Sequence, residues 1–289
     1  MRTMLMLLLL ISLLALPTRL WANAWMLDAG EGFAEVYNKF YWATQDYDYR
    51  GNMTEKPNSG RYEEFRPELK VEYGLCDQLN LLFAIPYKWA RWEDINGTLE
   101  NNGAEFVGVG AKLRLSKDLG RSPAASLQVK FETPGGYNRD TPPSLGHGKS
   151  DLETRLMIGK VLDNRRVFGT PVRLYHVGGE IGYRTLNNKI PYFVEVGLRP
   201  AKSVLVKGMI DGVFATSDID RPPADAELIQ KKYEEYSKVM VEVLISPDRV
   251  FGVLRDAKGL SIGLGYGYTF YGKNTAVGSE ITLKLFYRS

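Results

Sequence analysis

Apolar and polar side chains alternate along the stretch Glu64–Trp89. A period of two is typical of a β-strand, because successive side chains point to opposite faces. Only a short break around Cys76-Asp77 separates the two runs, which predicts a tight hairpin turn. Each run is about ten residues or longer, as a tilted strand needs to cross a bilayer, whereas strands of soluble domains average about five or six. The apolar positions are Phe65, Pro67, Leu69, Val71, Tyr73 and Leu75, then Leu79, Leu81, Phe83, Ile85, Tyr87 and Trp89.

The same alternation recurs from Ala34 to Tyr287 and predicts about twelve strands. Taken alone, one such hairpin would also suit a soluble sandwich with its charged face in water. The connections favour a membrane barrel, because long polar loops alternate with short turns and an even, closed set of strands leaves no exposed edge. Predicted loops or long connections are Asp46–Gly60, Arg91–Gly103, Thr133–Ser150, Val161–Pro171, Ser217–Lys232 and Ser246–Lys258.

Aromatic residues near the predicted strand ends support the same interpretation, since amphipathic rings favour the level of the lipid headgroups. We therefore predict an all-β fold, a transmembrane antiparallel up-and-down β-barrel of about twelve strands. A soluble, lipocalin-like exported binder is the alternative architecture. The aromatic residues are Tyr41, Trp42, Tyr73, Tyr87, Trp89, Tyr183, Tyr192, Phe270, Tyr271 and Tyr287.

The N-terminus has the three parts of a secretory signal peptide. Met1-Arg2 is a short basic region, Leu5–Leu16 is apolar, and Ala22-Asn23-Ala24 has the small residues of a cleavage site. The apolar part is shorter than the ~20 residues of a transmembrane helix. We expect residues 1–24 to be a signal peptide and residues 25–289 to form the barrel in the Gram-negative outer membrane.

Composition excludes several function classes. The formal net charge is +3, and Arg2 and Arg19 belong to the signal, so the exported chain is close to neutral and nucleic acid is not an expected partner. The single cysteine cannot form an internal disulfide. Only His147 and His176 could serve as catalytic histidines, and no spacing matches a zinc or calcium site. We expect no enzyme activity, no cofactor and no bound metal.

Charged residues of both signs occupy the alternate positions of the strands, here called the inward parity, that would face the interior of the barrel. Paired with one another they would fill a small barrel, whereas left in water they would line a passage for a polar solute. The sequence leaves both possibilities open. The candidate lumen residues are Glu64, Arg66, Glu68, Lys70, Glu72, Lys112, Arg114, Lys130, Glu132, Glu153, Arg155, Glu180, Arg184, Glu195, Arg199, Lys207, Asp211, Lys238, Glu242 and Lys284.

Several short motifs, in this order along nearly the whole chain, resemble a family of Gram-negative outer-membrane barrels that includes phenol-degradation-type (MetA-pathway) transporters and XagA-like proteins. Barrels of this kind usually end on an aromatic residue that the insertion machinery reads, whereas this chain ends Tyr287-Arg288-Ser289. The motifs are Tyr73-Gly74-Leu75-x-Asp77-x-Leu79, Pro86-Tyr87, Pro134-Gly135, Asp151-Leu152-Glu153-x-Arg155-Leu156-x-x-Gly159-Lys160, Glu180-Ile181-Gly182-Tyr183-Arg184 and Gly272-Lys273-Asn274-Thr275.

The barrel pattern and the resemblance together imply a channel or transporter for small polar or aromatic solutes. The resemblance also implies an alternative, a non-enzymatic accessory factor for the secretion of a surface exopolysaccharide. Expected partners are the lipid bilayer and its lipopolysaccharide, the outer-membrane insertion machinery, and an unidentified small solute or polysaccharide.

Overall fold

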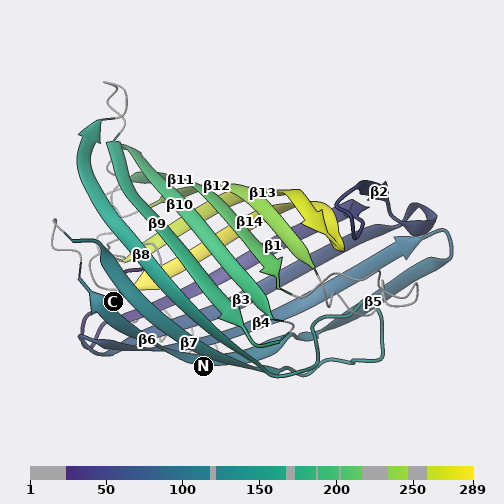
Figure 1. Cartoon of the computed structure of the whole chain (residues 1–289), viewed down its shortest axis with the longest axis horizontal. Helices are drawn as coiled ribbons and strands as arrows, with labels where there is room; N and C mark the ends of the chain where they lie inside the picture. Colours follow the sequence, from purple (N-terminus) through teal and green to yellow (C-terminus); the bar gives the residue numbers. More distant parts are fainter. Residues whose placement is uncertain are drawn as a thin grey trace, which may run out of the picture.

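Twelve long strands form one closed antiparallel barrel in the computed structural model, which describes residues 24–117, 122–166, 173–186, 188–201, 203–216, 234–246 and 259–289 (Figure 1). This confirms the predicted fold and its strand number. The barrel strands are β1 (Gly32–Tyr47), β3 (Arg61–Cys76), β4 (Leu79–Asp94), β6 (Phe106–Ser116), β7 (Ala124–Pro134), β8 (Asp151–Arg166), β9 (Arg173–Arg184), β10 (Lys189–Ala201), β11 (Val204–Ala215), β12 (Glu235–Ile245), β13 (Leu260–Lys273) and β14 (Thr275–Arg288).

The first and last strands close the barrel. β1 pairs with β14 from Phe33 opposite Arg288 to Tyr47 opposite Thr275, and its other edge pairs with β3. At the end of this seam the amide of Ser289 donates to the carbonyl oxygen of Gly32 at 2.8 Å. Closure satisfies backbone groups that an open edge would expose to lipid. Among the described residues, no helix is long and apolar enough to cross a membrane.

The two ends of the barrel differ. We call one end of the barrel the turn end. There only two residues separate Cys76, the end of β3, from Leu79, the start of β4, and the C-terminal Ser289 lies beside Gly32, the start of β1. At the opposite end, the loop end, two small elements extend the wall at the right of Figure 1. They are β2 (Met53–Glu55), which pairs with β1, and β5 (Gly97–Ala104), which pairs with β4.

Three predicted loops differ from the structure. The segment Arg91–Gly103 is a β-hairpin made by the end of β4 and by β5, and the segment Asp46–Gly60 holds β2 and a 3₁₀ turn, Pro57–Ser59. β8 also continues to Arg166, into the predicted connection Val161–Pro171. Outside the hydrocarbon a strand needs no apolar face, so its alternation fades where its hydrogen bonds continue. The segment Ser217–Lys232, nearly all of Ser246–Lys258 and most of the expected signal peptide lie outside the described residues.

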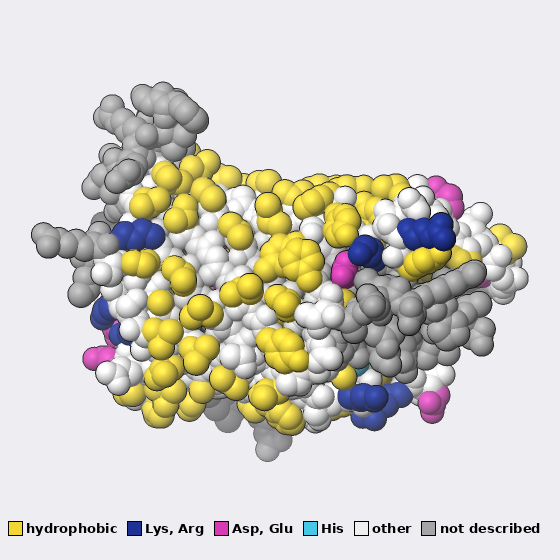
Figure 2. Space-filling view, viewed as in Figure 1, with side chains coloured by type: hydrophobic (Ala, Val, Ile, Leu, Met, Phe, Trp, Pro, Cys, Tyr) yellow, Lys and Arg dark blue, Asp and Glu magenta, His cyan; other side chains and the backbone are white. Residues whose placement is uncertain are grey.

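The outward face of the barrel is apolar. Val71 of β3, Val109 of β6 and Val241 of β12 are among its exposed side chains. Figure 2 shows hydrophobic side chains spread over the outer wall, with Lys, Arg, Asp and Glu gathered toward the two ends. In water such a surface would be an aggregation site, whereas a bilayer accommodates it.

One aromatic residue predicted for the headgroup level faces the lumen instead. Tyr41 lies opposite Glu280 of β14 and Glu64 of β3, and both carboxylates are buried inside the barrel. Residues directly opposite on paired strands share a face. The Tyr41 hydroxyl donates to the carbonyl oxygen of Ala276 at 3.1 Å. The prediction for Tyr41 was wrong, because its position near a strand end outweighed its parity.

Glycine forms much of the inward face of β13. A Cβ atom at Gly265 would lie 2.5 Å from the hydroxyl oxygen of Thr282, and one at Gly263 would lie 2.5 Å from a Leu244 methyl carbon. These positions allow side chains of β12 and β14 to meet across β13. Two ion pairs use this space, Lys238 with Glu280 at 3.0 Å and Lys284 with Glu242 at 2.6 Å.

We expect Val71→Arg to impair folding into lipid vesicles. An arginine on the lipid face near the middle of the bilayer costs about 2–4 kcal/mol. The control is Ile95→Arg at the highly exposed tip between β4 and β5, beyond the barrel wall. Urea titration of the refolded proteins measures the free energy of unfolding. Equal stability of the two variants would contradict the assignment of the outer face.

We expect Gly265→Leu to destabilise the barrel by about 1–3 kcal/mol, as overpacking of a filled interior does. Its side chain would displace Thr282 and the ion pairs that cross β13. Leu264→Ile, on the exposed outer face of the same strand, is the matched control. The midpoint of thermal unfolding in detergent reports the difference, and an unchanged midpoint for Gly265→Leu would disprove close packing over β13.

Candidate functional site: the lumen of the barrel

The structure places charged side chains from most of the barrel strands inside the barrel and joins them into ion pairs. Among the described residues, each member of the candidate lumen set except Arg199 takes part in an ion pair. Arg199 has its guanidinium carbon 3.5 Å from the centre of the Tyr175 ring. The paired residues are Glu64, Arg66, Glu68, Lys70, Glu72, Lys112, Arg114, Lys130, Glu132, Glu153, Arg155, Glu180, Arg184, Glu195, Lys207, Asp211, Lys238, Glu242 and Lys284.

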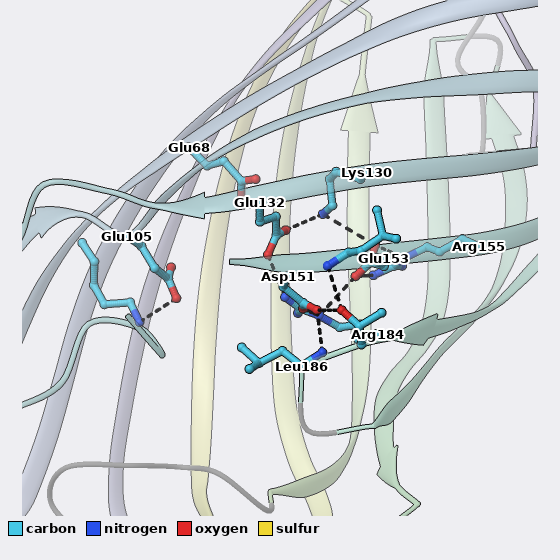
Figure 3. A network of polar contacts seen from close by, with 12 residues as sticks. Glu68, Glu105, Lys130, Glu132, Asp151, Glu153, Arg155, Arg184 and Leu186 are labelled. Carbon is cyan, nitrogen blue, oxygen red and sulfur yellow. Dashed lines mark hydrogen bonds and ion pairs between the residues drawn. The ribbon is translucent and has the colours of Figure 1, made fainter. Parts of the chain in front are cut away.

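The densest network joins β7, β8 and β9 (Figure 3). Arg155 donates from Nε to Glu153 at 2.6 Å and from Nη1 to Glu180 at 3.0 Å. Arg184 donates from Nε to Asp151 at 2.6 Å. Lys130 and Glu132 of β7 belong to the same network. They lie 2.8 Å apart, and Glu132 lies 2.7 Å from Arg184. Guanidinium groups suit this role because they donate in several directions at once.

A second network lies on β1, β3 and β4. Lys39 contacts Glu64 at 2.7 Å, and Arg66 contacts Glu105 at 3.0 Å. Lys88 lies between these pairs, 3.2 Å from Glu105. Lys70 has only longer contacts, at 3.4 Å to Glu35 and 3.9 Å to Glu68.

A third network follows β9 to β14 around the other side of the barrel. His176 has Nε2 3.2 Å from Glu195, and Lys207 lies 3.5 Å from Glu195 and 3.2 Å from Glu242. His176 is buried. Its ring also faces Trp25 edge to face, with the centroids 6.0 Å apart.

Some lumen charges are absent from the predicted set. Parity alone would have found most of them, because they alternate with the apolar positions of their strands. Glu105 lies between β5 and β6, where no alternation marks it. The missed residues are Glu35, Lys39, Lys88, Glu105, Asp151 and Glu280.

The turn end of the lumen is apolar, which the sequence analysis did not predict. Tyr175, Leu205 and Leu244 form a buried cluster against which Val161 and Phe286 pack. We call these five residues the apolar floor. Leu205 and Leu244 occupy the same parity as the charged Lys207 and Glu242 of their strands, so the inner face changes from charged to apolar toward this end.

The segment before β1 lies across the turn end. Its residues Ala24, Met26 and Leu27 are buried, although no strand includes them. Arg114 of β6 holds the segment, since its Nη2 donates to the carbonyl oxygens of Met26 at 3.1 Å and Leu27 at 2.9 Å. The same nitrogen lies 3.1 Å from the Asp28 carboxylate.

On the wall of β7 and β8, Ala24 packs against Ala124 and Met157, and Trp25 packs against the same cluster. A Cβ atom at Gly159 would lie 2.5 Å from the Trp25 ring, so the indole can pack here only because residue 159 has no side chain. On the opposite side the amide of Gly30 donates to the carbonyl oxygen of Gly74 at 2.8 Å. The segment 24–31 therefore spans the turn end from β3 to β8, and we call it the N-terminal segment.

At the loop end, the connection between β7 and β8 lies against the lumen network. The Lys88 ammonium donates to the carbonyl oxygen of Leu145 at 2.8 Å, and the Leu145 side chain is fully buried. The side-chain amide nitrogen of Asn101 on β5 contacts three carbonyl oxygens of this connection, those of Asn138, Thr141 and Pro143. Burial lowers the pKa of the His147 imidazole in the same connection, and the nearby Lys189 lowers it further.

The chemistry available in the lumen is that of charge, hydrogen bonding and apolar contact. Among the described residues, no group of three or more His, Cys, Asp or Glu side chains is arranged to hold a metal ion. The free thiol of Cys76 is exposed on the hairpin turn at the turn end. The arrangement offers charges of both signs, hydrogen-bond donors and acceptors, and apolar contact.

No protein-family model and no curated protein sequence matches the chain. Solved structures do. The COG4313 outer membrane channel from Pseudomonas putida F1 matches with a TM-score of 0.64 and 11% sequence identity, over 94% of this chain and 100% of that chain. The transport unit of the Escherichia coli autotransporter AIDA-I matches with a TM-score of 0.49 and 9% identity, over 96% of each chain. A Pseudomonas aeruginosa FadL homologue has a TM-score of 0.47 and 8% identity, over 91% of each chain. The chain therefore has the fold of an outer-membrane β-barrel.

Proposed function

We propose that the protein is an outer-membrane channel for small solutes that carry both a polar and an apolar or aromatic part. The observation that carries this proposal is the order of surfaces along the lumen. Paired charges line the middle, where Lys70, Arg155 and Arg184 keep a quarter or more of their side chains accessible. The apolar floor follows at the turn end. A solute with a polar and an apolar part would find a complementary surface at each stage.

The accessible cations distinguish this lumen from one filled only for stability. A filled barrel would bury its charges completely in pairs, because an uncompensated charge in a dry interior is costly. Here the network instead combines fully buried carboxylates, such as Glu153 and Glu242, with cations that remain partly in contact with solvent. This supports a hydrated passage.

The N-terminal segment would restrict passage at the turn end. It lies across that end and depends on Arg114 for hydrogen bonds to Met26, Leu27 and Asp28. Each hydrogen bond to a charged group contributes about 1.5–3 kcal/mol. Arg114 contacts three consecutive residues, and Lys117 adds a contact of 2.9 Å to Asp28, so a substitution of Arg114 would loosen this part of the segment.

We expect liposomes that contain the refolded protein to show slow swelling in small solutes, and Arg114→Gln to accelerate that swelling severalfold. The reason is that glutamine keeps a donor but loses the charge and the reach of the guanidinium. Arg61→Gln, an exposed cation paired with Glu63 at the loop end, is the control. The absence of flux in both the wild type and Arg114→Gln would exclude the channel and leave the accessory role in polysaccharide secretion.

We also expect conductance to rise in acid. A hydrogen bond from the Lys117 ammonium, aided by the guanidinium of Arg114, lowers the pKa of Asp28 below its ordinary value of 3.8. Because the pKa of Asp28 is lowered in the folded protein, its ion pairs with Lys117 and Arg114 stabilise the segment fully at a pH above the ordinary pKa. They are lost as the pH falls through the lowered pKa and the carboxylate is protonated. Single-channel conductance should therefore be constant from about pH 7 to about pH 5 and increase below the ordinary value.

Asp28→Asn separates this effect from the titration of other lumen carboxylates. The variant should show raised conductance already at neutral pH and a smaller acid response than the wild type. An acid response of unchanged size in Asp28→Asn would show that another group controls it.

A further inference from the structure

The ion pairs of the lumen are asymmetric in their exposure. In several pairs on β3, β7, β8 and β9 the cation is more accessible than its carboxylate. Arg184 is 27% exposed against 3% for Asp151, and Arg155 is 25% exposed against 1% for Glu153. Lys70 is the most accessible, at 44% against 9% for Glu68. Figure 3 shows the pairs of β7, β8 and β9. We call Arg66, Lys70, Lys130, Arg155 and Arg184 the cation belt.

Side-chain length explains the asymmetry. Lysine and arginine are longer than aspartate and glutamate, so from neighbouring strands the cationic ends reach farther toward the barrel axis while the carboxylates stay at the wall. The order reverses in three other pairs, Lys88 with Glu105, Lys112 with Glu72 and Lys238 with Asp211, and the first of these shares its carboxylate with Arg66. The cation belt contains no such reversal.

The consequence is chemical. Guanidinium and ammonium groups donate hydrogen bonds and accept none. A solute passing the cation belt therefore meets donors and positive charge first, although the lumen as a whole holds many carboxylates. Rings of Arg and Lys side chains are the arrangement that selects anions in pores.

An aromatic ring lies inside the same surface. Phe106 begins β6, and its ring lies over Gly108, whose Cβ position is 3.4 Å from the ring edge. The Arg66 guanidinium carbon is 6.0 Å from the centre of this ring, and the Lys130 ammonium is 5.8 Å from it. Each cation also has a close carboxylate partner, Glu105 at 3.0 Å for Arg66 and Glu132 at 2.8 Å for Lys130, with which a bound anion would compete, whereas Glu68 lies 3.9 Å from Arg66.

We propose that Arg66, Lys130 and Phe106 form a binding site for an aromatic carboxylate. The carboxylate would lie between the guanidinium and the ammonium group, and the ring would pack against Phe106. This inference rests on the proposed channel function and goes beyond it by naming the class of solute. The apolar floor would receive the ring of the same molecule at the next stage.

Binding is tested first, without any need for flux. Benzoate is titrated into the refolded full-length protein in detergent by isothermal calorimetry, in parallel with benzylamine and benzyl alcohol, which have the ring but not the negative charge. We expect binding of benzoate and at least tenfold weaker binding of the other two. Equal binding of benzoate and benzylamine, or no binding of benzoate, would overturn the proposal.

Two variants locate the site. Arg66→Gln should weaken benzoate binding at least tenfold. Phe106→Leu keeps an apolar residue and should weaken the binding of benzoate but not that of acetate, which has the carboxylate without the ring. Arg91→Gln is the matched control, since it removes one positive charge from an exposed pair with Glu93 at the loop end. If Arg66→Gln and Arg91→Gln bound benzoate alike, and Phe106→Leu bound it like the wild type, the site would be wrong.

The reversal potential in a potassium chloride gradient then separates this inference from the proposed function. Anion preference that decreases in Lys130→Gln supports both. Conductance without anion preference would support the proposed channel function but contradict the role of the cation belt in selecting anions. Benzoate binding without any conductance would keep the site and overturn the channel.

Discussion

The hydrogen bonds between β1 and β14 are the interaction on which the rest of the structure depends. In hydrocarbon, each unsatisfied backbone group costs several kcal/mol, so a sheet that spans the bilayer must close. Here the first and last strands meet over their whole length, from Phe33 and Arg288 to Tyr47 and Thr275. Closure then determines what each side chain contacts, because alternate residues must face either lipid or the interior of a narrow barrel.

Inside the barrel, ion pairs between strands offset the cost of burying charged side chains. Glu153 and Glu242 are almost completely buried, and each lies within ion-pair distance of at least two cations. Removing one partner would leave the carboxylate less compensated, which is strongly destabilising in a dry setting. The glycines of β13 make part of this possible, since they leave room for pairs between strands that are not neighbours. The network therefore supports the wall and also gives the lumen its chemical character.

The alternation of apolar and polar residues in the sequence was enough to predict the strands and their number. It failed where a strand leaves the hydrocarbon, as at β5, because no apolar face is required there. It also failed for Tyr41, where proximity to a strand end was given more weight than parity. The apolar floor could not be predicted from alternation, because Leu205 and Leu244 point inward but have apolar neighbours on both sides in the sequence. The path of the N-terminal segment could not be predicted, since a segment that crosses the end of a barrel outside its strands has no regular alternation of apolar and polar residues.

The hairpin turn between β3 and β4 has a practical consequence. Its thiol, at Cys76, is the single cysteine of the sequence and is exposed. A thiol reagent therefore marks one end of the barrel without any engineered residue. If a membrane-impermeant maleimide fails to label intact cells and labels them once the outer membrane is opened, the turn end faces the periplasm. The vectorial orientation of the native protein can thus be read from one covalent label.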